Sequence, residues 1–207
     1  ELAHKMQKVR ADRLCKTKAE VAPILWCYGA YARLKPEETL EKLVHNGYMT
    51  SSIGYSGLYE TVKALTGKNF YEDEQARQLG KEILQHMNDL CNQWKAEENI
   101  DYSIYGTPYE SGTYRTATKI KKQFGEDVFI KLDGEDRDFI TNSCHVPVWV
   151  HINPFEKLAI EKDFQLLSPG GLITYIESVD MSKNLEAMEQ VVDYIYENVQ
   201  YSERSEE

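Results

Sequence analysis

The feature that most constrains the fold is a long amphipathic segment, residues 73–98. Apolar side chains recur within it at three- and four-residue spacing, which is the period of one buried helix face. These side chains are Leu79, Ile83, Leu84, Met87, Leu90, Cys91 and Trp94. The segment predicts the clearest helix of the chain.

Shorter helical patterns and apolar β-branched runs alternate along the rest of the sequence. The other expected helices cover residues 2–14, 36–44, 58–66, 108–124 and 185–199. The expected strands cover residues 51–55, 102–105, 146–152 and 172–177, and residues 125–138 are expected to form an acidic loop. Strands that alternate with helices indicate the α/β class. We expect a single domain over residues 1–201 and a frayed acidic tail at 202–207.

The charge of the chain argues against a general polyanion binder. Its 207 residues carry 24 Lys and Arg against 34 Asp and Glu, a formal net charge of −10, whereas nucleic-acid binding usually rests on a basic face. No apolar run is long enough for a membrane-spanning helix, and the first residues lack the apolar core of a signal peptide. We therefore expect a cytoplasmic protein that binds neither nucleic acid nor membrane. Because the chain opens at Glu1 inside a charged amphipathic pattern, we also expect its start to be cut.

The four cysteines, Cys15, Cys27, Cys91 and Cys144, form no C-x-x-C pair. This spacing suggests neither a zinc site nor a disulfide framework, so reduced thiols are expected. His45 lies in a polar helical context and is expected to be solvated. No metal-ligand spacing is found, and the sequence predicts no metal site in this chain.

A turn between the strand at 102–105 and the following helix carries the most informative local motif. Thr107, Pro108 and Glu110 fit the N-cap, N1 and N3 positions of a capping box, which predicts a purely structural helix start. The same turn, with the hydroxyls of Ser111 and Thr113, fits a phosphate cradle at a helix N-terminus. The two interpretations are compatible, because an unfilled cap and an anion site use the same donors.

A second polar cluster, residues 141–147, leads into an expected strand and carries hydroxyl, amide, thiol and imidazole groups. Cys144 beside His145 suggests a nucleophile and a base. Neighbours on a strand point to opposite faces, however, so the two side chains would not easily meet. We favour a hydrogen-bonding anchor for a neighbouring loop.

Two glycine-containing turns allow structural and functional interpretations. Residues 168–171, Ser-Pro-Gly-Gly, fit a tight turn that needs positive φ, or a close backbone approach to a ligand or a buried loop. Residues 52–57, Ser-Ile-Gly-Tyr-Ser-Gly, fit a strand-to-helix turn, and their spacing matches neither a Walker loop nor a dinucleotide fingerprint.

Five segments occur in an order and spacing that closely resemble the anaerobic (class III) ribonucleoside-triphosphate reductases, the oxygen-sensitive glycyl radical form of ribonucleotide reductase. They are APILWCYGA, SIGYSGLYETVKALTGK, NIDYSIYGTPYES, DRDFITNSCHVPV, and LSPGGLITYIE with KNLEAM. The resemblance extends over about residues 22–201, and the five motifs together make it specific.

The resemblance implies the fold and the reaction. The family's catalytic domain is a ten-stranded α/β barrel with an interior finger loop, and this chain resembles the C-terminal portion of that barrel. The family makes deoxyribonucleotides from ribonucleoside triphosphates by glycyl and thiyl radical chemistry, commonly with formate as the reductant. Allosteric nucleotides regulate it, and a radical-SAM activase installs the radical.

The resemblance also implies roles for particular residues. The turn with Thr107, Glu110, Ser111 and Thr113 looks like the substrate phosphate-binding loop, and Tyr109 replaces the usual small residue. A second set, Asn142, Ser143 and His145, matches the segment that lines the active-site end of the barrel. Cys144 occupies the variable position of that segment, so no catalytic role is carried onto it.

The sequence departs from the family in what it lacks. It contains neither the catalytic cysteines, nor the radical glycine, nor the four-cysteine zinc site. We therefore assign no catalytic residue and no bound cofactor to this chain, which should be inactive alone; glycyl radical, zinc and formate are implied only for the intact enzyme. The expected partners are a ribonucleoside triphosphate, the activase of the intact enzyme, and a second copy through homodimer formation or self-association.

Two alternatives remain open from the sequence. A truncated, non-catalytic paralogue would bind nucleotide or a partner without turnover. An α/β interaction domain whose glycine-containing turns are purely structural would bind no triphosphate.

Overall fold

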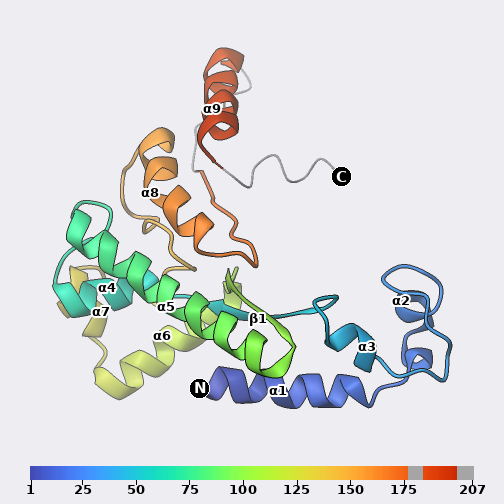
Figure 1. Ribbon diagram of the computed structural model, residues 1–207. Coiled ribbons are helices and arrows are strands. Elements are labelled where there is room, and N and C mark those ends of the chain that lie inside the picture. The colour runs from blue at the N-terminus through green and yellow to red at the C-terminus, as the bar shows by residue number, and fades with distance from the viewer. Residues whose placement is uncertain (177–183, 200–207) are drawn as a thin grey trace. The chain divides into compact units, whose positions relative to one another are not determined.

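The computed structural model describes residues 1–176 and 184–199, and Figure 1 shows how its elements follow one another along the chain. The helices are α1 (Leu2–Cys15), α2 (Pro23–Trp26), α3 (Glu41–Val44), α4 (Leu58–Thr66), α5 (Glu74–Glu98), α6 (Glu110–Phe124), α7 (Val128–Asp133), α8 (Pro154–Leu166) and α9 (Leu185–Asn198), with a short 3₁₀ helix at Ala19–Val21. The strands are β1 (Thr50–Tyr55) and β2 (Asp101–Gly106). The mixture confirms the α/β class.

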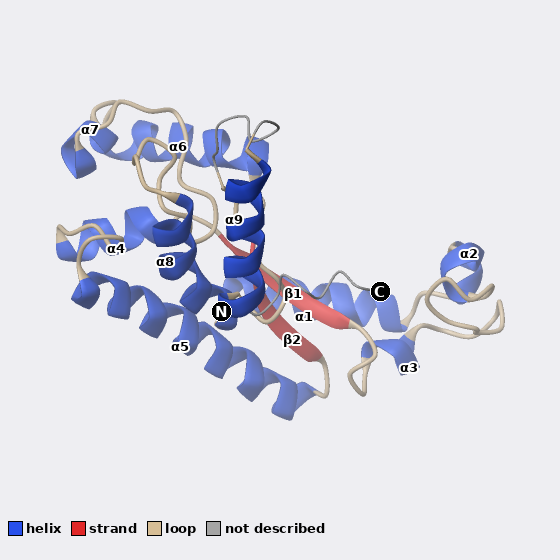
Figure 2. Cartoon of the chain, turned by 90° about the horizontal axis from the view of Figure 1, so that it is seen from above, coloured by secondary structure: helices blue, strands red, loops and turns tan. Residues whose placement is uncertain are grey.

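The two strands pair in parallel (Figure 2). Their register is fixed by hydrogen bonds between side chains on the same face of the sheet. The Thr50 hydroxyl donates to the Asp101 carboxylate over 2.8 Å, and the hydroxyls of Ser52 and Ser103 lie 3.3 Å apart. Both strands were expected from the sequence, at nearly these bounds.

The chain divides into two compact units. The first comprises Glu1–Ile53 and Asn88–Ser103, and the second comprises Gly54–Met87 and Ile104–Glu207. The apolar core of the first unit consists of Ala19, Ala32, Leu34, Leu40 and Leu43, with Leu14, Trp26, Cys27 and Met49 packed against it. A core cluster in the second unit consists of Ala117, Phe129 and Ile140, with Ile120, Val128 and Leu132 packed against it.

Most of the expected helices form. α1, α4, α5 and α9 match their predicted bounds within about two residues. α4 lies between two glycines with positive φ, Gly57 at 78° and Gly67 at 70°, which confirms the stop predicted at Gly67. The helix expected over 36–44 is reduced to α3, because Thr39 forms a bridge with Lys18 instead of entering a helical turn.

The strand predicted at 146–152 is wrong. Val146 donates its N–H to a carboxylate of α8, Pro147 has no N–H to donate, and Val150 closes a turn onto the Pro147 carbonyl. The apolar residues of this run therefore belong to an irregular segment in which Val146 is buried and Val148 is exposed. The strand predicted at 172–177 is likewise absent over residues 172–176, and Glu177 lies outside the described residues, as does the tail at 202–207.

Three α-helices occur where the sequence predicted none, and one of them is the single-turn helix α2. α7 lies inside the predicted acidic loop, and α8 follows the segment predicted as a strand. α8 begins with a side-chain cap, because the Asn153 side chain accepts a hydrogen bond from the Glu156 N–H at 3.0 Å, with Pro154 at the first helical position.

The capping box predicted at Thr107 is wrong. α6 begins at Glu110 with Tyr109 as its N-cap residue, and no side chain caps it. Thr107 instead continues the pairing of the strands, since its N–H donates to the Tyr55 carbonyl at 3.1 Å. Its own carbonyl accepts from the Ser143 hydroxyl at 3.1 Å. Both backbone groups of Thr107 are therefore engaged outside the helix.

Among the described residues, no helix is both long enough and apolar enough to cross a membrane.

Asn153 and Thr107 both precede a proline near a helix start, and we expect their substitution to have different effects on the free energy of unfolding. Asn153→Ala removes a side-chain cap and should lower the free energy of unfolding by about 1 kcal/mol. Thr107→Ala removes a hydroxyl that is buried without a hydrogen-bond partner, so it should not lower the free energy of unfolding through loss of a cap, because an unsatisfied buried hydroxyl is itself destabilising. Urea unfolding followed by circular dichroism measures both, and a larger loss in Thr107→Ala would restore the capping-box interpretation.

Candidate functional site

The segment 141–145 runs beside the start of α4 within the second unit. The Gly57 N–H donates to the Thr141 carbonyl at 2.9 Å, and the Leu58 N–H donates to the Ser143 carbonyl at 3.1 Å. The left-handed conformation of Ser143, with φ 45°, accommodates this path. The glycine turn before α4 and the segment 141–145 are more than 80 residues apart in sequence. These two backbone hydrogen bonds hold them side by side.

The same segment also holds the turn between β2 and α6. The Tyr109 N–H donates to the Asn142 side-chain oxygen at 3.0 Å, and the Ser143 hydroxyl donates to the Thr107 carbonyl at 3.1 Å. These bonds confirm the prediction that residues 141–147 anchor a neighbouring loop.

The Ser168–Gly171 turn packs against the end of β2. The Gly170 N–H donates to the Ile104 carbonyl at 2.8 Å, and the Gly106 N–H donates to the Gly171 carbonyl at 2.9 Å. Gly171 has φ 109°, which confirms the predicted need for positive φ at that glycine. A Cβ atom at Gly106, the last residue of β2, would collide with the Leu172 side chain. The segment that the Ser168–Gly171 turn approaches closely is therefore the end of this strand.

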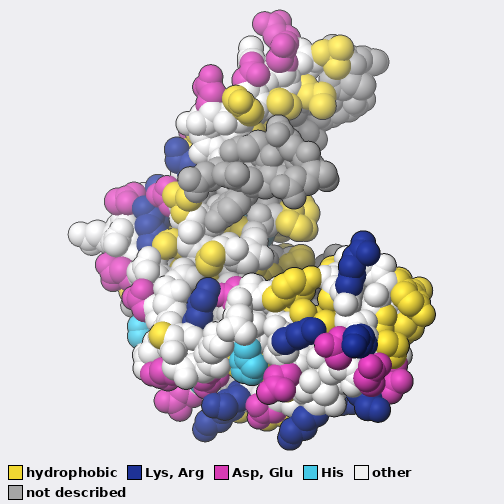
Figure 3. Space-filling view, turned by 45° about the vertical axis from the view of Figure 1, so that its right-hand side comes forward, with side chains coloured by type: hydrophobic (Ala, Val, Ile, Leu, Met, Phe, Trp, Pro, Cys, Tyr) yellow, Lys and Arg dark blue, Asp and Glu magenta, His cyan; other side chains and the backbone are white. Residues whose placement is uncertain are grey.

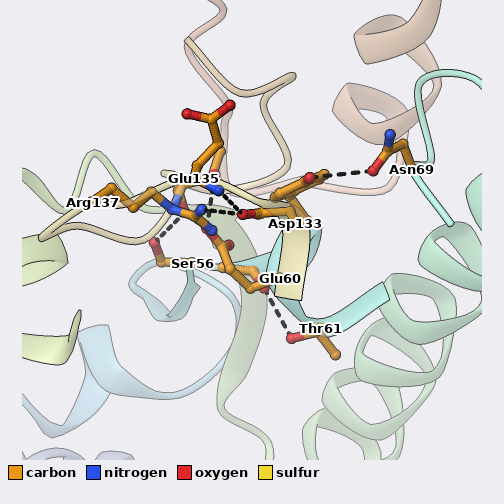
Figure 4. Close-up of polar contacts among 10 residues, drawn as sticks. Ser56, Glu60, Thr61, Asn69, Asp133, Glu135 and Arg137 are labelled. Carbon is orange, nitrogen blue, oxygen red and sulfur yellow. Dashed lines mark hydrogen bonds and ion pairs between the residues drawn. The ribbon is translucent and has the colours of Figure 1, made fainter. Parts of the chain in front are cut away.

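A buried ion-pair network supports the start of the polar segment (Figure 4). One oxygen of Glu60, on α4, accepts from the Thr141 N–H at 2.8 Å, from the Thr141 hydroxyl at 2.9 Å and from Arg137 at 3.2 Å. Arg137 also pairs with Asp133, at the end of α7, over 2.7 Å. Its guanidinium lies 4.5 Å from the ring centres of both Phe129 and Trp149, an arrangement favourable to a cation.

A second buried carboxylate supports the other end of the segment. Glu161, on α8, is fully buried, and its two oxygens lie 2.9 Å from the Val146 N–H and 3.1 Å from His145 Nδ1. Because a carboxylate accepts hydrogen bonds, the His145 proton is assigned to Nδ1. In the neutral ring Nε2 is therefore the acceptor, and Glu161 fixes the orientation of the imidazole.

Cys144 does not form a dyad with its neighbour His145. Its side chain is fully buried, and burial, together with the charge of Glu161, raises the pKa of the thiol well above its ordinary value. His145 is engaged with Glu161. No strand forms in this segment, although the sequence-based prediction against the dyad assumed one. In the structure the dyad is precluded because Glu161 engages His145 Nδ1 and the thiol is buried.

One cavity of about 150 Å³ collects three of the predicted site residues. Its lining consists of Thr113, Phe139, Ile140, Thr141, Asn142, His145, Val146, Val148, Lys157 and Tyr175. Lys157 is buried, and the Tyr175 ring stands edge-on to His145 with centroids 5.7 Å apart. The cavity combines a cationic side chain, an amide, a hydroxyl and an oriented imidazole.

The remaining predicted residues do not line this cavity. Thr107 lines a second cavity, of about 420 Å³, which shares Ile140 with the first. Ser111 is exposed in the first turn of α6. Ser143 is buried, and its hydroxyl donates to the Thr107 carbonyl in the turn before α6. Glu110 begins α6, and its side chain lies outside the described part of the structure.

Glu60, Arg137 and Glu161 were not predicted as site residues from the sequence. Glu60 lies in the first turn of an amphipathic helix, where an exposed acidic residue is common, so its position gave no signal of burial. Arg137 lies within a run of acidic residues, and Glu161 lies on a helix that was not predicted. The Asn-Pro-x-Glu start at 153–156 could have identified α8.

Among residues 1–176 and 184–199, no group of three or more His, Cys, Asp or Glu side chains is placed to hold a metal ion.

Comparison with known proteins gives consistent matches. A family model described as anaerobic ribonucleoside-triphosphate reductase matches residues 1–207. Proteins of that name from Haemophilus influenzae and Escherichia coli are 37% and 36% identical to the chain, over 97% of it and 28% of their own length. The protein of that name from Enterobacteria phage T4 is 37% identical over 93% of the chain and 30% of its own length. The chain thus spans less than a third of these relatives.

The buried network predicts a large cost for removing its cation. Arg137→Met leaves the carboxylates of Asp133 and Glu60 buried without their partner, which should lower the free energy of unfolding by about 3–5 kcal/mol. The control is Lys131→Ala, which breaks the exposed Lys131–Asp127 pair on α7 and should cause no measurable loss. Equal losses in urea unfolding of the two variants would contradict the role of Arg137.

Proposed function

Because the chain belongs to the anaerobic ribonucleoside-triphosphate reductase family, we propose that it is the part of such an enzyme that holds the triphosphate of a ribonucleotide substrate. The reaction is the reduction of a ribonucleoside triphosphate to a deoxyribonucleotide in the cytoplasm. Alone, the chain is expected to be inactive, because its sequence contains neither a radical glycine segment nor the catalytic cysteines of the family.

The observation that carries this proposal is the convergence of the motifs at the start of α6. The first N–H groups of a helix have no intrahelical partner and carry the positive end of its dipole. No side chain caps α6, so these donors suit an anion such as phosphate. The adjacent cavity presents Thr113, Asn142 and His145 from one side of this helix start.

We assign binding and positioning to these residues and no step of bond breaking. The N–H groups of the first turn, with the Ser111 and Thr113 hydroxyls, would hold phosphate oxygens. Asn142 and Ser143 keep the turn in place through Tyr109 and Thr107. A fixed triphosphate would restrict the ribose to one orientation, which is how positioning contributes to rate.

For the intact enzyme we propose the ten-stranded barrel of the family. The parallel pairing of β1 and β2, with α4 and α5 between them in sequence, supports this proposal, since parallel strands require such crossovers. The radical that the intact enzyme would carry supplies one-electron chemistry at the ribose. Radical glycine, zinc cysteines and formate would be held by segments other than this one, and a radical-SAM activase would be a partner of the whole enzyme.

Substitution at the first turn of α6 tests the phosphate assignment in the full-length reductase. Ser111→Ala removes one hydrogen bond, worth roughly 0.5–1.5 kcal/mol, and should raise the dissociation constant of the substrate about two- to tenfold. The dissociation constant of the allosteric nucleotide should not change. Thr118→Ala, an exposed hydroxyl two turns further along α6, is the matched control and should alter neither.

Binding of substrate and effector nucleotides is measured separately by equilibrium dialysis with the unactivated enzyme. Equal weakening of both nucleotides by Ser111→Ala, or a similar effect of Thr118→Ala, would count against the phosphate site.

We also propose that the chain self-associates. Large apolar side chains are exposed on both units, including Val21, Ile24 and Tyr28 on the first and Leu185 and Tyr196 on the second, and Figure 3 shows apolar groups at the surface. Such exposure is typical of surfaces that are covered in an assembly. Sedimentation velocity at tens of micromolar should detect dimers or larger species, and a single monomeric boundary would refute this.

A further inference from the structure

Cys15 and His45 form a side-chain pair in the first unit. Cys15 is the last residue of α1, and its sulfur lies 3.7 Å from His45 Nε2. Both residues are half-buried. His45 follows α3 directly and is not the solvated histidine expected from the sequence.

The orientation of the imidazole determines what the pair can do. His45 Nδ1 lies 3.1 Å from the Asn99 carbonyl oxygen, which can only accept a hydrogen bond, so the proton is on Nδ1. In the neutral ring Nε2 then carries a lone pair directed at the Cys15 thiol. A nucleophile, a base within reach and a third group that orients the base is the arrangement of an activated nucleophile.

The backbone around His45 holds this arrangement in place. His45 forms an antiparallel bridge with Ile100. The side chain of Asn99 donates to that of Asn46 at 3.1 Å, and both asparagines adopt positive φ, 53° and 68°. Residues with side chains rarely adopt this conformation, which indicates that surrounding contacts maintain it. These contacts hold the Asn99 carbonyl in the position that orients the ring.

The surroundings of the thiol make such a base necessary. Burial raises the pKa of the Cys15 thiol, and the carboxylates of Glu41 and Asp12 raise it further, with Lys16 opposing them. The C-terminal end of α1 acts in the same direction as the carboxylates. The thiol is therefore protonated at neutral pH, and it can react there by transferring its proton to His45 as it attacks.

The other cysteines have different surroundings. Cys91 and Cys144 are buried, and burial raises the pKa of both thiols. Cys27 is half-buried like Cys15 but packs against the apolar core of the first unit. Cys27 is therefore the natural internal reference.

We propose that Cys15 and His45 form a thiol-modification site that exchanges with small disulfides. The Cys15 sulfur attacks one sulfur of the disulfide, a new S–S bond forms and the old one breaks. The thiol proton passes to His45 Nε2 and then to the departing sulfur, so the products are a mixed disulfide on Cys15 and one free small thiol. The Cys15 thiol is oxidised, the departing sulfur is reduced, and no other reactant is required.

Labelling of the full chain with glutathione disulfide at pH 7 tests the proposal. The rate at each cysteine is followed by mass spectrometry of peptides that carry one cysteine each. Cys15 should react faster than the other three, and His45→Gln should slow Cys15 about tenfold through loss of the base. Cys27 should keep its rate in His45→Gln within about twofold, which also reports that the first unit remains folded. An unchanged rate at Cys15, or faster labelling of Cys27 than of Cys15, would overturn the proposal.

The unsubstituted chain provides a second test that does not depend on the folding of a variant. The pH profile of labelling at Cys15 should differ in shape from that at Cys27, because Cys15 has an imidazole base within 3.7 Å of its sulfur. Parallel pH profiles for the two cysteines would contradict the role of His45.

Discussion

The second unit depends on two buried carboxylates that satisfy an irregular backbone segment. Residues 141–146 are buried except for the half-buried Asn142, and they belong to no helix or strand. A buried N–H group without a partner would destabilise the fold. Glu60 accepts from the Thr141 N–H and Glu161 from the Val146 N–H. Burying a carboxylate is itself costly, so each also has a further partner, Arg137 or His145. The segment is held at both ends by ionic side chains of two helices.

This support bears on the phosphate site that we propose at the start of α6. With its ends fixed, the segment directs the side chains of Asn142 and Ser143 at the backbone of the preceding turn. The turn is thereby held from outside, and Thr107 remains in the strand pairing instead of capping the helix. Because the N-cap residue of α6 provides no side-chain cap, the proposed phosphate site would use the helix donors that a capping box would otherwise have engaged.

Sequence patterns predicted the helices and strands that have strong local signals. They failed where contacts between residues far apart in the sequence determine the local structure. The apolar period of 73–98 and the two glycines around α4 predicted both helices closely. The same proline-containing start pattern occurs at 107–110 and at 153–156, and only the second is a capped helix start. The difference lies in Tyr55 and Ser143, which engage Thr107 from positions that no local pattern reveals. The apolar run at 146–152 fails as a strand for a similar reason, since its first N–H is taken by Glu161.

The histidines show the same limit for chemistry. Adjacency in the sequence suggested Cys144 and His145 as a nucleophile and a base, an interpretation rejected in favour of a hydrogen-bonding anchor. The structure pairs that histidine with Glu161 and buries the thiol. The thiol and imidazole that do meet, Cys15 and His45, are 30 residues apart, and each lies at the end of its helix. Their meeting depends on the carbonyl of Asn99, which orients the ring from a third segment. Residue type and spacing therefore identify candidate groups. Both histidines carry the proton on Nδ1, and only His45 has a thiol within reach of its free Nε2 among the contacts of the described residues.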